Sequence, residues 1–318
     1  MELWQIIVLI VGGLVLFLII SYFIFLYSLF LVLFKRMKHE VLLTDVDLEK
    51  THYKPFMDMV IRNIKVFSMI PYYKVSIMSN DGYKLYGKYY KNGDSKKTLV
   101  FFHGYHADPL NNINTPGLMM LKKGYNILLI TERAHGESEG KYITFGVKEK
   151  EDALLWLSYL NDNYHPENIV LWGVSMGCAT VEMISNKLPS NVSLLVLDCG
   201  FTGAYEEVLY SLEKRCKYKP KVTMLFLSIF ARLHGFKLEK GVAKDSLKGC
   251  KVPALFIHGE KDSMVPLSMG MENYNSHNGV KKQLIIDAGH AVSIYVGYKE
   301  IEEEIDKLLN EHVKWKAH

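Results

Sequence analysis

The chain has 318 residues, 49% of them hydrophobic, which is enough for one large α/β domain with a smaller appendage. Its formal net charge of +4 is small and its basic residues are scattered, so it lacks the clustered Lys and Arg of a nucleic-acid-binding protein. Single cysteines at positions 178, 199, 216 and 250 exclude the paired spacing of a zinc site and the density of a disulfide scaffold. They indicate reduced thiols, with a surface disulfide left open as an alternative.

The first predicted element is a membrane-spanning helix. From Ile6 to Phe34 the sequence is uncharged and almost entirely apolar, and a bilayer core requires only roughly 20 such residues. A cleaved signal peptide is the alternative, but the chain begins Met1-Glu2-Leu3 without a basic region, and no small-residue cleavage site follows. We therefore expect residues 1–38 to be a transmembrane anchor, with the lipid bilayer as its partner.

A basic flank and a mixed segment follow this helix. The basic cluster Lys35-Arg36-Met37-Lys38 follows the span, whereas the only charged residue before it is Glu2. The positive-inside rule therefore predicts a single-pass protein with a cytoplasmic catalytic domain. Within residues 39–71, apolar and basic side chains alternate at helical spacing, which predicts an amphipathic juxtamembrane helix in a linker. Packing on the bilayer and packing on the domain are both open for it.

From residue 72 to 318 the pattern is that of one α/β domain. It opens with a hairpin, because Asn80-Asp81-Gly82 separates two alternating runs. Short apolar runs then alternate with helical stretches, which predicts a mostly parallel sheet flanked by helices. The predicted strands are Lys74–Met78, Tyr83–Tyr90, Thr98–Phe102, Asn126–Ile130, Ile169–Trp172, Leu194–Leu197, Ala254–Ile257 and Leu284–Ile286.

The predicted helices fill the intervals between these strands. One interval, about residues 201–250, breaks the alternation and predicts a short helical lid over the strand ends. Its apolar residues suit a lipophilic acyl pocket, and ordinary packing on the body is the alternative. The predicted helices are Thr115–Lys123, Gly146–Asn161, Met176–Leu188, Ser268–Asn275 and Tyr298–Lys314, with Tyr205–Tyr218 and Val222–Leu233 in the lid.

The segment Gly173-Val174-Ser175-Met176-Gly177 lies between a predicted strand and a predicted helix. That context distinguishes a nucleophile elbow from a chance pattern in a loop. Gly173 and Gly177 fit the elbow because the helix and strand approach too closely for Cβ atoms. Ser175 is thus the expected nucleophile, at a helix N-terminus that favours developing negative charge.

A serine hydroxyl needs a base, and the base needs an orienting acid. His290 follows the last predicted strand and is the expected base. Asp262, after the strand Ala254–Ile257, is the expected acid, and the chain order of the three groups suits this elbow. Asp198, at the end of Leu194–Leu197, is the alternative acid.

Two backbone N–H groups are expected to form an oxyanion hole. One is that of Met176, directly after the nucleophile, and the other is that of Tyr105, in the loop after Thr98–Phe102. Gly104 would let this backbone approach the substrate. His103 and His106 could alternatively bind a metal, but no carboxylate cluster with metal spacing accompanies them.

Together these segments resemble the α/β-hydrolase superfamily, and within it the membrane-anchored bacterial serine-aminopeptidase-like group. The resemblance covers roughly residue 72 to the C-terminus. One departure is that relatives commonly carry Asp two residues before Arg133, where this chain has Thr131 followed by Glu132. The resemblance rests on His103-Gly104-Tyr105, Arg133-Ala134-His135-Gly136-Glu137-Ser138-Glu139-Gly140, Gly173–Gly177, Asp198-Cys199-Gly200-Phe201, His258-Gly259-Glu260-Lys261-Asp262 with Val265-Pro266, and Gly289-His290.

The resemblance and the site imply a serine hydrolase that cleaves a carboxylic ester or related acyl bond through an acyl-enzyme, without metal or cofactor. The substrate would be a small or acylated molecule, and the apolar lid favours a lipophilic one. A serine peptidase is the first alternative, with Glu206, Glu207 and Glu213 in the lid available to hold a substrate amine. A non-catalytic membrane-bound binding protein is the second, and the complete set of Ser175, Asp262 and His290 argues against it.

Overall fold

The computed structural model describes residues 2–37, 42–45, 51, 53–215 and 220–312. Outside this part lie Lys38 of the predicted basic flank, Cys216, and the predicted helix ends at Tyr218 and Lys314. Everything below refers to the described residues.

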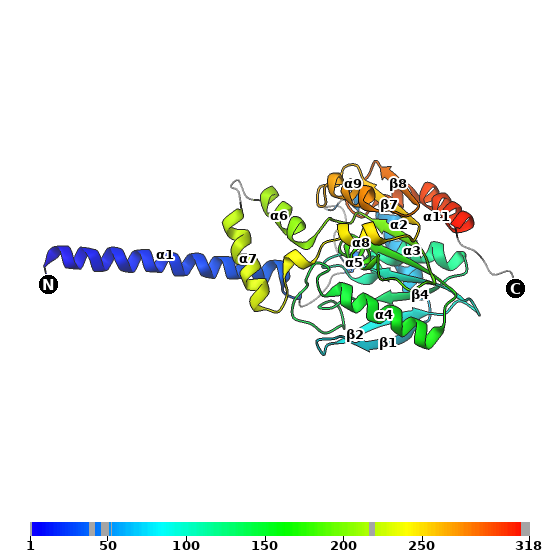
Figure 1. Ribbon diagram of the computed structural model, residues 1–318, viewed down its shortest axis with the longest axis horizontal. Helices are drawn as coiled ribbons and strands as arrows, with labels where there is room; N and C mark the ends of the chain where they lie inside the picture. The colour runs from blue at the N-terminus through cyan, green and yellow to red at the C-terminus, as the bar shows by residue number, and fades with distance from the viewer. Residues whose placement is uncertain (1, 38–41, 46–50, 52, 216–219, 313–318) are drawn as a thin grey trace.

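One eight-stranded sheet organises the domain, in the order β1-β2-β4-β3-β5-β6-β7-β8 (Figure 1). β1 pairs antiparallel with β2 and β2 with β4, and every other neighbouring pair is parallel. The mostly parallel sheet predicted from the sequence is therefore confirmed. The strands are β1 Tyr73–Met78, β2 Lys84–Tyr90, β3 Lys97–Phe102, β4 Asn126–Ile130, β5 Asn168–Val174, β6 Val192–Asp198, β7 Ala254–Gly259 and β8 Lys281–Ile286.

The central strands bury both faces of the sheet. In β3, Val100 and Phe102 belong to one hydrophobic cluster, whereas Leu99 and Phe101 belong to another on the opposite face. Successive side chains of a strand point to opposite faces, so a strand between two helical layers must be apolar throughout. Because β3 and β5–β8 run parallel, their carboxyl ends meet at one sheet edge, where loops can carry polar groups.

Helices cover the sheet, and several boundaries differ from the predicted ones; α4, for example, begins at Glu149 rather than Gly146 and ends at Tyr164 rather than Asn161. α3 begins at Pro109 rather than Thr115, because the Asp108 side chain accepts a hydrogen bond from Leu110 N (2.8 Å) and Pro109 occupies the first helical position. α5 ends at Ile184, before the predicted Leu188. The short α8 and α10 were missed because one turn or so shows no helical periodicity. The helices are α3 Pro109–Lys122, α4 Glu149–Tyr164, α5 Met176–Ile184, α8 Lys244–Gly249, α9 Leu267–Ser276, α10 Ser293–Val296 and α11 Tyr298–His312.

The N-terminal helix α1 (Leu3–Phe34) is the one described helix long and apolar enough to cross a membrane. Its mean hydropathy reaches 2.9 in a window that is not buried at all, so it is no core helix. Its C-terminal end is different, because Leu26, Phe30 and Phe34 are completely buried. Ile143 N also donates to the Phe34 carbonyl (2.7 Å), so this end of α1 belongs to the domain.

The juxtamembrane segment contains η1 (Leu43–Asp45), η3 (Lys54–Phe56) and helix α2 (Met57–Ser68). Val60, Ile64 and Phe67 of α2 are buried in the same cluster as residues of α3. A Cβ at Gly117 of α3 would lie 2.3 Å from the Phe67 ring, so the two helices touch closely. Of the two alternatives for this segment, the structure has the one in which it packs on the domain.

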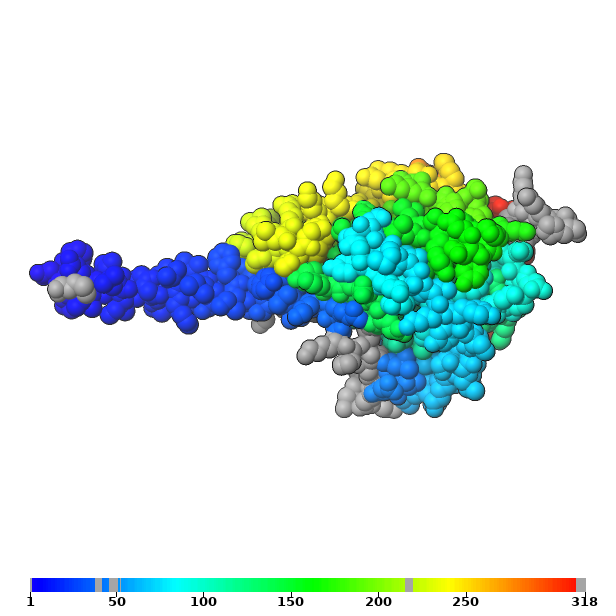
Figure 2. Space-filling model, turned by 90° about the horizontal axis from the view of Figure 1, so that it is seen from below, coloured from blue at the N-terminus to red at the C-terminus, as the bar shows by residue number. Residues whose placement is uncertain are grey.

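The interval 201–250 contains α6 (Ala204–Arg215), α7 (Lys221–Leu233), η4 (Leu238–Lys240) and α8. α7 buries Met224, Leu227 and Ala231 in the main core cluster and exposes Leu225 and Leu233. It lies beside the C-terminal half of α1, as the ribbon and the space-filling view both show (Figures 1 and 2).

Candidate active site

Ser175 stands on a sharp turn between β5 and α5. Its backbone has φ 54° and ψ −114°, a conformation that costs a non-glycine residue energy and recurs at functional sites. A Cβ at Gly173 would lie 2.5 Å from Cys178 backbone atoms, and one at Gly177 would lie 2.3 Å from the Phe102 carbonyl oxygen. Both glycines are therefore required sterically, as the sequence predicted for a nucleophile elbow.

Ser175, His290 and Asp262 form a hydrogen-bonded chain. His290 Nε2 lies 2.9 Å from Ser175 Oγ, and His290 Nδ1 lies 2.7 Å from Asp262 Oδ2. The three residues come from the ends of β5, β8 and β7, which the parallel sheet brings to one edge. This arrangement holds the imidazole so that it can take the proton of Ser175.

Asp262 is kept ionised by the donors around it. Its side chain is fully buried, and burial alone would raise its pKa. The hydrogen bond with His290, and those that Oδ1 accepts from Met264 N (2.8 Å) and Val265 N (2.9 Å), outweigh burial and hold the pKa below its ordinary value. A charged Asp262 can then stabilise the imidazolium that forms at His290 during proton transfer.

Asp198, the alternative acid, lies close by in a different role. Its carbonyl accepts a hydrogen bond from Ser175 N (2.8 Å), so its backbone supports the elbow. Its side chain is buried, and Oδ1 has no hydrogen-bond partner. Burial raises the pKa of Asp198 to about 7. The described contacts thus join His290 to Asp262 and leave Asp198 as a buried second carboxyl.

Replacing this carboxyl by an amide gives a test of pH dependence. In the folded chain Asp198 has a pKa raised to about 7, above the ordinary 3.8, so the proton stabilises the fold at low pH. That contribution is lost as the pH rises through 7, at about 1.4 kcal/mol per pKa unit. We expect Asp198→Asn to raise Tm relative to wild type more at pH 8 than at pH 5. Equal Tm differences at both values, measured by thermal unfolding, would contradict the raised pKa.

The loop after β3 lies beside the nucleophile. A Cβ at Gly104 would lie 3.6 Å from Ser175 Cβ, so this backbone passes at van der Waals distance from the nucleophile. Gly104 N donates to Asn112 Oδ1 (2.8 Å), which uses this N–H and fixes the loop next to Ser175. Met176 is the first residue of α5, where a helix leaves N–H groups without an intrahelical partner. The loop that contains Tyr105 and the start of α5 therefore flank the same position.

Two further hydrogen bonds hold this loop in place. His135 Nε2 accepts a hydrogen bond from His106 N (3.1 Å), which requires a neutral ring, and burial lowers the pKa of His135 well below its usual value. Tyr105 Oη donates to the carbonyl of Leu33 in α1 (2.8 Å). No local pattern could reveal this second contact, because it joins residues 72 positions apart.

Arg133 is braced by carboxylates from other elements. It pairs with Asp152 of α4 (2.6 Å) and with Asp81 of the first hairpin turn (2.9 Å). Both carboxyl oxygens of Glu132 are buried without a hydrogen-bond partner, and burial raises the pKa of this group. Thr131 thus replaces the Asp that relatives commonly carry there, and Arg133 pairs with carboxylates of α4 and of the hairpin turn instead.

Two other features could suggest different sites. Cys199 Sγ lies within 4.8 Å of a ligand atom of both Asp262 and His290, and these three groups form a donor set that could hold a metal. Asp262 and His290 are, however, already hydrogen-bonded to each other.

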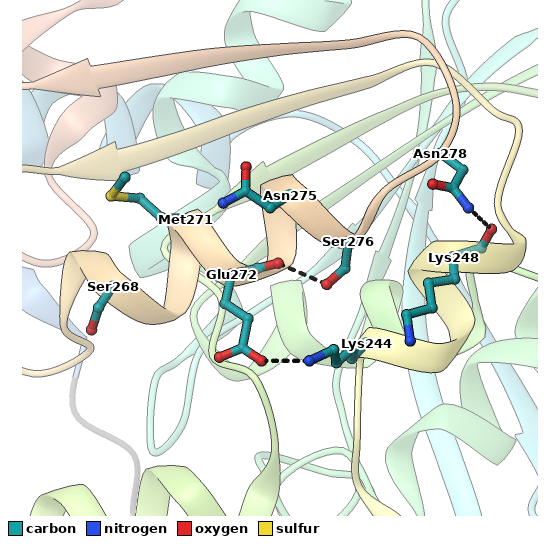
Figure 3. Close-up of a pocket in the computed structure, with 8 residues that line it drawn as sticks. All are labelled: Lys244, Lys248, Ser268, Met271, Glu272, Asn275, Ser276 and Asn278. Carbon is teal, nitrogen blue, oxygen red and sulfur yellow. Dashed lines mark hydrogen bonds and ion pairs between the residues drawn. The ribbon is translucent and has the colours of Figure 1, made fainter.

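An open hollow of about 680 Å³ lies between α8 and α9 (Figure 3). Its polar groups bond to one another, for example Glu272 to Lys244 (3.2 Å), and none of the predicted catalytic residues lines it. The candidate active site is therefore located by the hydrogen-bonded Ser175, His290 and Asp262, and not by the hollow between α8 and α9.

No family model matches the chain, but individual proteins do. The uncharacterised protein YqkD of Bacillus subtilis is 28% identical over 73% of this chain and 78% of its own length. The lysophosphatidylserine lipase ABHD12 of Danio rerio is 27% identical over 51% of this chain, which spans only 44% of that relative. The α/β-hydrolase domain-containing protein WAV2 of Arabidopsis thaliana is 27% identical over 61% of this chain and 63% of its own length.

Solved structures agree with this relationship. The esterase Pf2001 of Pyrococcus furiosus superposes with a TM-score of 0.63 at 26% identity, covering 79% of this chain and 93% of that one. The strand order, the strained serine turn and these likenesses define the protein as one of α/β-hydrolase fold. Relatives and solved structures that carry α/β-hydrolase, lipase and esterase names are similar to this chain, and they support a hydrolase activity.

Proposed function

We propose that the protein is a serine hydrolase that cleaves a carboxylic ester or related acyl bond. The observation that carries the proposal is the hydrogen-bonded chain from Ser175 through His290 to Asp262, set on a strained turn at a helix N-terminus. A catalytically silent binding protein would have no need to hold these groups in this order. The esterase and lipase names among its relatives support the same class.

The reaction would proceed in two halves. Ser175 Oγ attacks the acyl carbon while its proton passes to His290 Nε2, and the N–H groups of Met176 and Tyr105 stabilise the oxyanion. Collapse expels the alcohol, which takes the proton from His290 and leaves an acyl-enzyme on Ser175. Water then attacks the acyl-enzyme, with His290 first as base and then as acid, and releases the carboxylic acid.

The acidic groups of α6 support a peptidase less well than the rest of the site supports an esterase. An exopeptidase needs an ionised carboxylate to hold the substrate's ammonium group. Glu207 is buried, and burial raises its pKa to about 8, which disfavours the carboxylate that an ammonium group requires. Glu206 and Glu213 lie on the exposed side of α6. We therefore keep the acyl ester as substrate class, and propose that α6 and α7 form its lid.

We also propose that α1 anchors the enzyme by a single pass, with the catalytic domain in the cytoplasm. The basic residues Lys35 and Arg36 directly after the span support this orientation. Buried free thiols at Cys178, Cys199 and Cys250 suit a reducing compartment. A signal peptide that is cut off would take Phe30 and Phe34 out of the core, which supports a permanent anchor.

A fluorophosphonate probe tests the proposal, because only an activated serine reacts with it readily. We expect the purified wild type to be labelled, and Ser175→Ala and His290→Ala to lose the label. Circular dichroism of each variant controls for folding. A well-folded wild type that does not react would remove the catalytic assignment and favour a binding protein.

A further inference from the structure

An apolar groove runs between the anchor and the inserted helix α7. Its volume is about 460 Å³, within the usual range for small-ligand sites. Aromatic contacts hold its two walls together, Phe23 against Phe226 (5.1 Å between ring centroids) and Tyr27 against Phe230 (5.3 Å). The groove is lined by Ile20, Phe23, Ile24, Tyr27, Ser28 and Phe230.

α7 also carries an apolar face that no described residue covers. While one side of the helix is buried in the core, Val222, Leu225 and Leu233 on the other are 57%, 57% and 75% exposed. A soluble surface rarely leaves such side chains together in water, and a contiguous group of them indicates a contact with protein or membrane. Figure 2 shows this part of the chain, in yellow, lying against α1 where it leaves the body.

The aromatic residues of α1 fix the level of the bilayer. Trp4 and Tyr27 are exposed and stand 27 − 4 = 23 residues apart, or about 35 Å at 1.5 Å per residue. That matches a hydrocarbon core of about 30 Å with aromatic side chains at both interfaces. The bilayer surface on the domain side then falls near Tyr27, which contacts Phe230 of α7, and the contact of Phe23 with Phe226 lies about 6 Å deeper in the leaflet.

We propose that α7 dips into this leaflet and that the groove receives an acyl chain of a bilayer lipid, so that the enzyme draws its substrate from the membrane. The wall formed by Ile20 and Ile24 continues the lipid-facing surface of the span, so a lipid chain can pass into the groove without crossing water. The inference rests on the proposed serine hydrolase and names lipid as its substrate class.

The first test separates membrane substrate from soluble substrate. The full chain, reconstituted in phosphatidylcholine vesicles, is assayed on a long-chain fluorogenic acyl ester in the bilayer and on soluble p-nitrophenyl butyrate. Because a carboxylate resists insertion, we expect Leu225→Glu with Leu233→Glu to lower hydrolysis of the bilayer ester about tenfold or more. Hydrolysis of the butyrate ester should stay unchanged.

Ile285→Glu is the matched control, since Ile285 is 47% exposed on β8 and should leave both activities unchanged. Ser28→Trp, which fills the groove, should slow the long-chain ester and spare the butyrate. Unaltered bilayer activity in the α7 and groove variants would overturn the inference. If the wild type hydrolyses neither ester, the proposed hydrolase itself fails.

A second readout needs no activity. In a Trp4→Phe background, Leu225→Trp is expected to be quenched by phosphatidylcholine with brominated acyl chains, above the quenching of the background protein. No added quenching would place α7 outside the leaflet. If Ile24→Cys instead cross-links two chains, a second copy fills the groove and the proposal is wrong.

Discussion

Asp262→Asn is expected to lower kcat/KM for a soluble acyl ester by about 10⁴-fold, because the amide no longer selects the imidazole tautomer that accepts the Ser175 proton. Asp262 Oδ2 bonds His290 Nδ1 at 2.7 Å, and the two N–H groups on Oδ1 already fix the carboxyl's orientation. An Asn at this position would keep its carbonyl oxygen on the two backbone N–H groups and turn its NH₂ toward His290 Nδ1. That nitrogen would then meet a donor where its own N–H needs an acceptor. Steady-state hydrolysis of p-nitrophenyl butyrate measures the effect.

Asp198→Asn is the matched control for that loss. It removes a carboxyl of the same size from the same sheet edge, but no hydrogen bond joins it to His290 among the described contacts. We expect its activity to stay within about threefold of wild type, since a carboxyl that is not hydrogen-bonded to the imidazole does not orient it. A larger loss in Asp198→Asn than in Asp262→Asn would mean that His290 uses Asp198 in solution.

Removal of residues 1–37 is expected to unfold the domain, whereas removal of residues 1–22 is expected to leave it folded. The end of α1 contributes Leu26, Phe30, Leu33 and Phe34 to the core. At about 1.5–3 kcal/mol for each buried side chain, their loss approaches the whole stability of a typical domain, about 5–15 kcal/mol. Deletion of 1–37 would also take away the Leu33 carbonyl that holds Tyr105.

Thermal unfolding of both truncated proteins, with butyrate hydrolysis as a second readout, compares them with the full chain. The shorter deletion should keep most of the Tm and of the soluble-ester activity while losing attachment to vesicles. If the chain that begins at residue 38 unfolds at the wild-type Tm, the contacts of α1 with the domain contribute little to its stability. In that case α1 would attach the domain to the membrane without stabilising its fold.

The sequence by itself determined the sheet and the order of the site. Its strands are short apolar runs with buried faces, and its elbow needs two glycines because Phe102 and Cys178 leave no room for a Cβ. These are local requirements, so they leave a pattern within a few residues of Ser175. Chain order then predicted which strand ends meet, because parallel strands bring their carboxyl ends to one edge.

Only the tertiary structure decided the contacts between distant segments. Which carboxyl bonds His290 depended on the path of the loop after β7, since Asp198 and Asp262 both follow strands at that edge. Asn112 and the Leu33 carbonyl hold the loop after β3 from elements that show no periodic link to it. The end of α1 is as apolar as the rest of the span, so hydropathy could not separate the part that lies in lipid from the part that completes the core. Burial of Phe30 and Phe34 makes that distinction, because it depends on which surfaces meet after folding rather than on the residues alone.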